Sequence, residues 1–322
     1  MTWRDGVRIL QARAPVPAPC RLCLRFCALA VLVVMGASVA DAEPFQRRSI
    51  TVDGLERSYL IKTPAHRRSR EAPLIVYLHG GGGKARMDRS PAQGWIWVAP
   101  EGIDKSWSID GLAQANGQVP VQDDIAFLDA LIAEVVAREQ ADPARIVLVG
   151  TSRGGFLTFL AMKRLRARVH AAVTIISAMP SHVWSGFAVR TPTHIMMVNG
   201  TDDPLVRYQG GEDVQRGAKR LANTASQPIE ATARDLAVMQ GLSAEPTVTA
   251  LPDMRDDGCR IERLDWGDRH GAASVTLYKM IGGGHTLPGV LNPYPQALVG
   301  STCRDVRMPD LLQGFLNDVL RR

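Results

Sequence analysis

Short apolar runs alternate with amphipathic stretches along residues 43–322. Eight runs have the length and composition of strands, and several are nearly continuous in Val, Ile and Leu, as in strands buried on both faces of a parallel sheet. The predicted strands are 49–52, 58–62, 74–78, 96–99, 146–149, 172–176, 194–198 and 275–280. This alternation predicts an α/β fold with a mainly parallel central sheet and helices on both of its faces.

The helical stretches fill the spaces between these runs. Apolar residues recur at helical spacing directly after Asp123 and Asp124, at positions 125, 127, 128, 131, 132 and 135. We interpret the two aspartates as capping residues, with a metal or acid site as the alternative. Further helices are predicted after Gly154 and at 214–221, 232–239 and 311–320. Residues 207–274 are the least regular part, and after the two helices within them we expect loops that shape a substrate site.

The first 42 residues have the features of a signal peptide. Arg21 and Arg25 precede an apolar run over residues 27–35, and the small residues Ser38, Ala40 and Ala42 supply a cleavage site. The run is too short to span a bilayer. We therefore expect export, to the periplasm or the medium, and one catalytic domain over residues 43–322, with an uncleaved membrane anchor as the alternative.

Removing this leader changes the charge of the chain. The full chain has a formal net charge of +6, and the leader holds five arginines and two aspartates, so the mature chain carries about +3. No cluster of basic residues indicates a nucleic-acid partner. Two of the five cysteines, Cys259 and Cys303, follow the leader. In an exported protein they form a disulfide or remain free, and the sequence leaves both open.

The strand at 146–149 runs directly into Gly150-Thr151-Ser152-Arg153-Gly154, and a helical pattern begins at once. This is the context of a nucleophile elbow, in which glycines on both sides of a serine permit a tight turn that exposes its hydroxyl. The alternative is a glycine-rich turn that binds phosphate at a helix N-terminus. We take Ser152 as the candidate nucleophile.

A serine nucleophile needs a base and an acid that orients it, and the elbow fold supplies them in the order Ser, Asp or Glu, His. Asp202 and Asp203 follow the strand at 194–198, and His285 follows three glycines after the strand at 275–280. Either aspartate suits the turn before Pro204, and the loop chemistry favours Asp203. We take His285 as the candidate base.

Backbone N–H groups must also stabilise the negative oxygen of the transition state. Arg153, the residue after the nucleophile, is the first candidate donor. The second comes from His79-Gly80-Gly81-Gly82-Gly83, which follows the strand at 74–78 and matches an HGGG-type loop. Gly81 is preferred, with Gly82 as the second choice.

These segments together resemble one family of exported α/β-hydrolases, which includes polyhydroxybutyrate depolymerase-like proteins and feruloyl and acetylxylan esterases. The resemblance spans nearly all of the mature chain. It rests on YLHGGGG (77–83), APEG (99–102), DDIAFLDALI (123–132), DPARIVLVGTSRGG (142–155), NGTDDPLVRY (199–208) and GGGHTLPG (282–289). The resemblance also implies that Asp203 is the acid and His285 the base.

The resemblance implies ester hydrolysis through a covalent acyl-enzyme, with no metal and no organic cofactor. The expected substrates are hydroxyalkanoate oligomers, feruloyl or acetyl esters of polysaccharides, or small esters. Leu287 stands where the family often has Trp, and Trp107 lies between two serines where a Trp-Asn pair is common. Trp107 is a candidate for lining the substrate pocket, with a packing role as the alternative. A peptidase, an acyltransferase and a non-catalytic binding protein remain alternatives.

Overall fold

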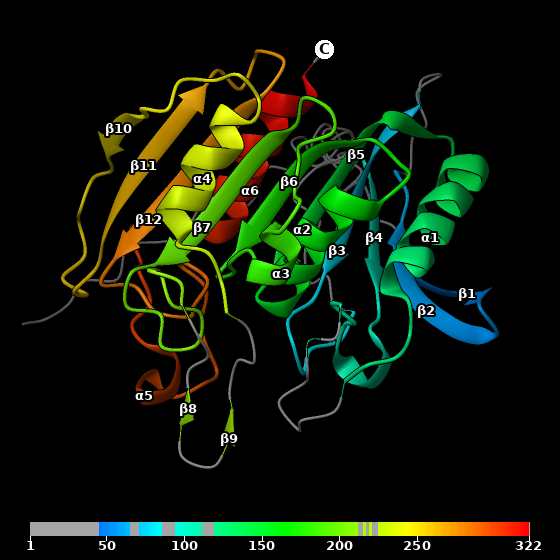
Figure 1. Cartoon of the computed structure of the whole chain (residues 1–322), viewed down its shortest axis with the longest axis horizontal. Helices are drawn as coiled ribbons and strands as arrows, with labels where there is room; N and C mark the ends of the chain where they lie inside the picture. Colours follow the sequence, from blue (N-terminus) through cyan, green and yellow to red (C-terminus); the bar gives the residue numbers. More distant parts are fainter. Residues whose placement is uncertain are drawn as a thin grey trace, which may run out of the picture. The chain divides into compact units, whose positions relative to one another are not determined.

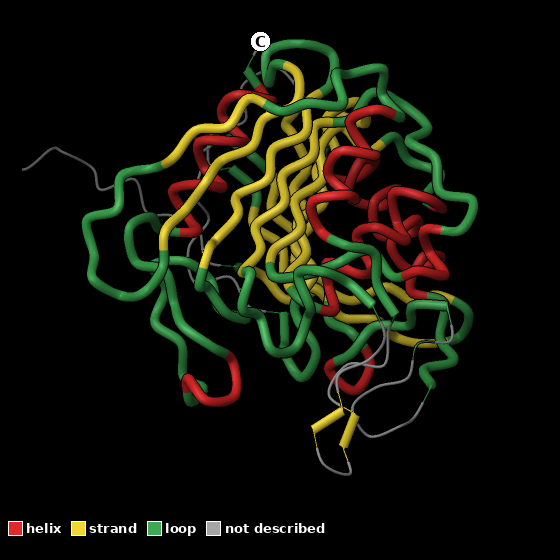
Figure 2. The backbone as a smooth tube through the Cα atoms, turned by 60° about the vertical axis from the view of Figure 1, so that its left-hand side comes forward, coloured by secondary structure: helices red, strands yellow, loops and turns green. Residues whose placement is uncertain are grey.

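The computed structural model describes residues 45–64, 71–85, 94–110, 112, 119–211, 215–216, 219–220 and 225–321. The predicted signal peptide lies outside these residues. The described chain is built around one twisted ten-stranded sheet, with helices lying against it (Figures 1 and 2).

The ten strands of this sheet follow the order β1-β2-β4-β3-β5-β6-β7-β12-β11-β10. The six strands from β4 to β12 are mutually parallel, and the two strands at each edge are antiparallel to their inner neighbours. In chain order the strands are β1 Gln46–Val52, β2 Leu55–Lys62, β3 Ala72–Leu78, β4 Ile96–Pro100, β5 Ala141–Thr151, β6 Val169–Ile175, β7 His194–Gly200, β10 Thr247–Ala250, β11 Arg260–Gly267 and β12 Ser274–Ile281.

Side chains of the central strands point alternately into two cores. Leu74, Val76 and Leu78 of β3 belong to one core, and Ile75 between them belongs to the other. The first core is closed by α1 (Asp124–Glu139), α2 (Arg153–Arg164), α3 (Ser181–Trp184) and α4 (Ile229–Val238), and the second by α6 (Met308–Leu320). The predicted sheet with helices on both faces is therefore confirmed.

Parallel strands place their carboxyl ends along one edge of a sheet, and loops at this edge carry the functional groups of open α/β folds. In Figure 1, the arrowheads of β7 and β12 point toward the end of the molecule that carries α5 (Gln296–Val299) and the small hairpin of β8 (Gln215–Arg216) and β9 (Lys219–Arg220). The loops after β3, β5, β7 and β12 are the segments that the sequence singled out.

All eight predicted strands are present, but residues 207–274 differ from the prediction. The described part of the predicted helix at 214–221 forms the antiparallel hairpin of β8 and β9. Strands β10 and β11 occupy what was predicted as loop. They were missed because their residues do not form an apolar run: on β11 the buried residues Ile261, Leu264 and Trp266 are separated by charged ones. The helix predicted at 232–239 is confirmed as α4.

Over the described residues, we find no helix that combines the length and the apolar character needed to cross a membrane.

Candidate active site

Ser152 lies at a sharp turn between β5 and α2. Its φ of 51° is uncommon for a residue with a side chain. Its N–H donates a hydrogen bond to the Ile175 carbonyl of the neighbouring strand at 2.8 Å. A Cβ on Gly154 would collide with the Leu78 carbonyl of β3, and one on Gly150 with the Gly154 carbonyl. The glycines therefore let α2 start close to the sheet, as a nucleophile elbow requires.

The loops after β7 and β12 bring two more predicted residues to this serine. The Nε2 atom of His285 lies 3.0 Å from the Oγ atom of Ser152, and its Nδ1 atom lies 2.7 Å from the Oδ2 atom of Asp203. Asp203 Oδ1 accepts hydrogen bonds from the N–H groups of Leu205 and Val206, at 2.7 and 2.8 Å. These bonds leave Oδ2 aimed at the imidazole. The three predicted side chains thus form one continuous chain of hydrogen bonds.

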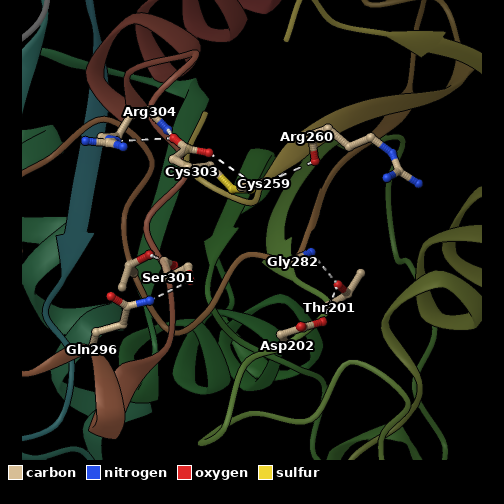
Figure 3. Close-up of a disulfide and its surroundings, with 11 residues drawn as sticks. Thr201, Asp202, Cys259, Arg260, Gly282, Gln296, Ser301, Cys303 and Arg304 are labelled. Atoms are coloured by element: carbon tan, nitrogen blue, oxygen red, sulfur yellow. Dashed lines mark hydrogen bonds and ion pairs between the residues drawn. A yellow bond between two sulfur atoms is a disulfide. The ribbon is translucent and has the colours of Figure 1, made fainter. Parts of the chain in front are cut away.

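Asp202, the other candidate acid, has a different role in the loop. Its Oδ1 accepts from the Thr201 hydroxyl at 2.8 Å, and its N–H donates to the Gly283 carbonyl at 2.9 Å. Figure 3 shows Thr201 and Asp202 beside Gly282, whose N–H donates to Thr201 Oγ1. Asp202 therefore ties the β7 loop to the loop that carries His285, and only Asp203 contacts the imidazole.

The loop that carries His285 is held by the chain segment at 299–303. The N–H groups of Gly284 and His285 donate to the carbonyls of Ser301 and Val299, at 2.9 and 2.5 Å. A disulfide between Cys259 and Cys303 joins this segment to the start of β11, with a Cα–Cα distance of 5.2 Å (Figure 3). That distance lies in the usual range for disulfides. The two cysteines that follow the leader are thus disulfide-bonded, and the disulfide lies beside the loop that carries His285.

The glycine loop after β3 lies against the elbow. A Cβ built on Gly81 would lie 3.6 Å from Arg153 Cδ, and one on Gly80 would lie 3.4 Å from Ser152 Cβ. The Gly81 N–H donates no hydrogen bond to another described residue. Gly81 therefore lies beside Arg153, the other candidate donor, and stays a candidate.

Gly82, the second choice, differs from Gly81 in its contacts. Its N–H donates to the Lys105 carbonyl at 2.8 Å. A hydrogen already used in this way is not available to an oxyanion, so we withdraw Gly82 as a candidate donor.

The structure also contradicts the substrate-lining role considered for Trp107. Its side chain has no exposed surface, and its indole N–H donates to the His79 carbonyl at 2.8 Å. The alternative of a packing role is the correct one. The sequence could not show this, because the contact joins two loops that follow different strands.

The Arg153 side chain makes hydrogen bonds to the loop that carries Trp107. Its Nε and Nη2 atoms donate to the Trp107 carbonyl at 3.0 and 2.8 Å, and Nη2 also donates to the Leu112 carbonyl at 2.9 Å. Burial lowers the pKa of Arg153 to about 10, which leaves the side chain charged at neutral pH. Arg153 thus contributes its backbone to the elbow and its side chain to the neighbouring loop.

The two aspartates at the start of α1 make different contacts. Asp123 caps the helix, because its Oδ1 accepts from the N–H groups of Ile125 and Ala126 at 2.9 Å each. Asp124 is buried and paired with Arg57 at 2.5 Å. Within the described ranges, no three metal-ligating side chains come together. The capping prediction is therefore confirmed for Asp123, whereas Asp124 is an ion-pair partner.

Comparisons with known proteins show that this chain is similar to several hydrolases. A model of the prolyl oligopeptidase family matches residues 101–191, which include the elbow but neither Asp203 nor His285. "Putative esterase NocK" from Nocardia uniformis subsp. tsuyamanensis is 26% identical over 86% of this chain and 84% of its own. Feruloyl esterase C from Emericella nidulans is 27% identical over 54% of this chain, and the match spans 64% of that enzyme.

Among solved structures, an acetyl xylan esterase from Aspergillus awamori superposes with a TM-score of 0.51 at 16% identity, covering 75% of this chain and 94% of that one. This likeness shows the fold. The prediction of an α/β-hydrolase that resembles feruloyl and acetylxylan esterases is confirmed, and with it the class of serine carboxylic-ester hydrolase. The resemblance to polyhydroxybutyrate depolymerase-like proteins stays a prediction.

Proposed function

We propose that this chain is an exported serine esterase that cleaves carboxylic esters through an acyl-enzyme on Ser152. One observation carries the proposal. Ser152 Oγ lies 3.0 Å from His285 Nε2, and His285 Nδ1 lies 2.7 Å from Asp203 Oδ2. Contacts of this length let an imidazole take a proton from a serine while a carboxylate holds the ring.

The proposed reaction has two halves. With Nδ1–H donated to Asp203, the neutral imidazole of His285 offers Nε2 as a base, and it takes the hydroxyl proton as Ser152 attacks the ester carbonyl. The tetrahedral intermediate then expels the alcohol, which receives that proton from His285. In the second half, water loses a proton to His285 and attacks the acyl-enzyme. This step releases the carboxylic acid and returns the proton to Ser152.

The N–H groups of Gly81 and Arg153 are the proposed donors to the oxyanion. Negative charge builds up on the carbonyl oxygen only during the reaction, so donors that are already oriented lower the barrier without a reorganisation cost. The support is spatial: Gly81 lies against the Arg153 side chain, and Arg153 begins α2 directly after Ser152.

For the substrate, we propose a soluble ester or oligomer. Relatives of this chain are named for feruloyl and acetylxylan ester hydrolysis, which supports feruloyl or acetyl groups on polysaccharides. Hydroxyalkanoate oligomers and small esters remain further candidates from the sequence resemblance. A release assay with methyl ferulate, acetylated xylo-oligosaccharides and hydroxybutyrate oligomers would rank these classes by kcat/KM.

Peptide cleavage is the second candidate function. The prolyl oligopeptidase family model over residues 101–191 is the observation that favours it. Triad geometry does not fix the leaving group, so the same residues would serve an amide or transfer the acyl group to another alcohol. Nitroanilide peptides assayed beside nitrophenyl esters separate these activities.

Export is supported by the disulfide of Cys259 and Cys303. Disulfides persist in oxidising compartments and are rare in the cytosol. Expression of the whole chain, cell fractionation and N-terminal sequencing test the export. The expected mature protein begins at Glu43 and is found in the periplasm or the medium; a chain that stays in the cytosol at full length contradicts this.

Hydrolysis of 4-nitrophenyl acetate and butyrate tests the esterase proposal. The wild type should be active, and Ser152→Ala should lose at least about 10³-fold in kcat. Ser177→Ala is the matched control, because Ser177 is a buried neighbour of the elbow whose hydroxyl has no hydrogen-bond partner among the described residues. It should stay near wild-type activity. An inactive wild type favours the remaining alternative, a non-catalytic binding protein, and equal activity in Ser152→Ala excludes the proposed nucleophile.

A further inference from the structure

The candidate oxyanion loop is a tight turn in which the N–H groups of Gly82 and Gly83 are used in hydrogen bonds. The Gly83 N–H donates to the Gly80 carbonyl at 3.0 Å, and Gly82 has a φ of +73°. A four-residue turn with positive φ at its third position is a type II turn, which favours glycine there. Gly82 donates to the Lys105 carbonyl, whereas Gly81, which lies against Arg153, keeps its N–H uncommitted among the described contacts.

Glycines do not hold an orientation by themselves, since they have the greatest backbone freedom of all residues. The loop therefore needs an external support, and His79 is the first part of it. Its Nε2 accepts from the Gly102 N–H at 3.0 Å, so the ring proton sits on Nδ1, 2.8 Å from the Gly80 carbonyl. Burial lowers the pKa of His79, which favours this neutral form.

Trp107 is the second part of the support. Its indole N–H donates to the His79 carbonyl, and the two rings lie 4.7 Å apart between centroids. The side chain is completely buried. The carbonyl that Trp107 holds belongs to the peptide that enters the glycine turn, so a shift of Trp107 would tilt the peptide next to Gly81.

Contacts from other segments of the chain also fix the loop that carries Trp107. Asp124 Oδ2 accepts from the Ser108 N–H at 2.6 Å, and Asp124 Oδ1 is paired with Arg57. On the other side, the Arg153 guanidinium donates to the Trp107 carbonyl. A buried ion pair and a charged side chain thus hold the peptide group that joins Trp107 to Ser108, which makes the loop a stiff support.

We infer that Trp107 is a positioning residue for the oxyanion hole, acting through the His79 carbonyl on the orientation of the Gly81 N–H. This inference rests on the proposed function, and it assigns to a buried tryptophan a role in rate, in addition to its role in packing. A donor displaced by an ångström stabilises the transition state less while it leaves substrate binding nearly unchanged.

Trp107→Phe tests this inference because it keeps an aromatic ring at this position and removes the N–H donor together with the pyrrole part of the indole. The chain offers a matched control in Trp266. That residue is also buried, and its indole N–H donates to the Ala244 carbonyl at 3.0 Å, outside the loops of the site. Both variants lose one buried indole hydrogen bond, so both should lose a similar amount of thermal stability.

The expected results differ in the kinetics. For 4-nitrophenyl acetate, Trp107→Phe should lower kcat about tenfold with KM within about twofold, because removal of a direct oxyanion donor costs about 10²–10³ and a misplaced one costs less. Its affinity for a trifluoromethyl ketone, which forms an oxyanion adduct with a serine, should fall by the same factor. Trp266→Phe should change neither quantity.

Equal kcat and equal inhibitor affinity in the two variants would overturn the inference. If Trp107→Phe does not fold, His79→Gln carries the same test, because it can keep an acceptor for the Gly102 N–H and loses the ring bond to the Gly80 carbonyl. A lowered kcat with unchanged KM supports the inference, and an unchanged kcat overturns it. Ser152→Ala separates this from the proposed function: if it is inactive while Trp107→Phe is fully active, only the positioning role fails.

Discussion

Two adjacent aspartates show how much a single position decides in this site. Asp203 sends one carboxylate oxygen to His285 and the other to two backbone N–H groups, whereas Asp202 contacts Thr201 and the backbone of Gly283. Both are the same residue type in the same loop. The difference in their proposed roles is therefore a difference in direction, which a pair of substitutions can measure.

Asp203→Asn should lower kcat for nitrophenyl esters by about 10³–10⁴-fold, because an amide that donates to Nδ1 favours the imidazole tautomer with its proton on Nε2, which cannot accept from Ser152. Asp202→Asn is the matched control and should stay within about threefold of the wild type. Steady-state kinetics of both variants make the comparison. A larger loss in Asp202→Asn than in Asp203→Asn would reverse our assignment.

At the residue scale, the sequence best predicted the residues whose candidate roles follow from their order along the chain. Ser152, Asp203 and His285 each follow a predicted strand, and parallel strands bring such loops to one edge. The second choice of Gly82 and the substrate-lining alternative for Trp107 are not supported, because these residues bond to Lys105 and His79 across loops. Spacing along the chain holds no information about such contacts.

At the scale of elements, the strands predicted best were those buried on both faces. Their continuous apolar runs are unmistakable, as in β3 and β5. Strands β10 and β11 lie at the edge of the sheet, where charged side chains interrupt the pattern. The hairpin of β8 and β9 stands where the sequence favoured a helix. Local propensity thus sufficed in the core of the sheet and at the edge formed by β1 and β2, and failed at the edge formed by β11 and β10.

The disulfide is an element of the His285 support, since it joins β11 to the segment at 299–303. Replacing both cysteines by serine should cost about 2–4 kcal/mol of the free energy of unfolding. It should also lower kcat, because the segment that accepts from the Gly284 and His285 N–H groups loses its anchor. Urea unfolding and ester kinetics measure the two effects.

Arg304→Ala is the control for this disulfide prediction. Arg304 is an exposed partner of Asp257, so its ion pair links nearly the same two segments as the disulfide does. Exposed pairs contribute at most about 1 kcal/mol. The variant should therefore keep its activity, and a loss as large as that of the double cysteine variant would show that the disulfide has no special part.

At the scale of the whole molecule, the free energy of unfolding should depend on pH through His194. This buried histidine lies at the end of β7 opposite to the loop that carries Asp203. His194 begins β7, and its Nδ1 lies 3.0 Å from the Ser274 hydroxyl. Burial, with a further contribution from nearby His170, lowers the pKa of His194 to about 4 from its usual 6.5. The unfolded chain then binds more protons than the folded one between these values, so folding weakens as pH falls below about 6.5.

Between pH 7 and pH 5, His194 should remove about 2 kcal/mol from the free energy of unfolding. Urea unfolding at these two pH values measures the change. His194→Asn should flatten the dependence, because asparagine stays neutral and keeps a polar group near Ser274. His270→Asn replaces an exposed histidine and should leave the dependence as it is in the wild type. Equal pH dependence in all three proteins would contradict the role of His194.

The described chain combines a mainly parallel sheet with loops that meet at one edge, and the central claim is that one serine at this edge carries the acyl group. Treatment with a nitrophenyl alkyl phosphonate, which reacts with activated serines, followed by peptide mass spectrometry, tests that claim most directly. We predict one adduct per chain, on Ser152, formed in step with the loss of esterase activity and absent from Ser152→Ala. An adduct on another residue, or full activity in the modified protein, would contradict the account.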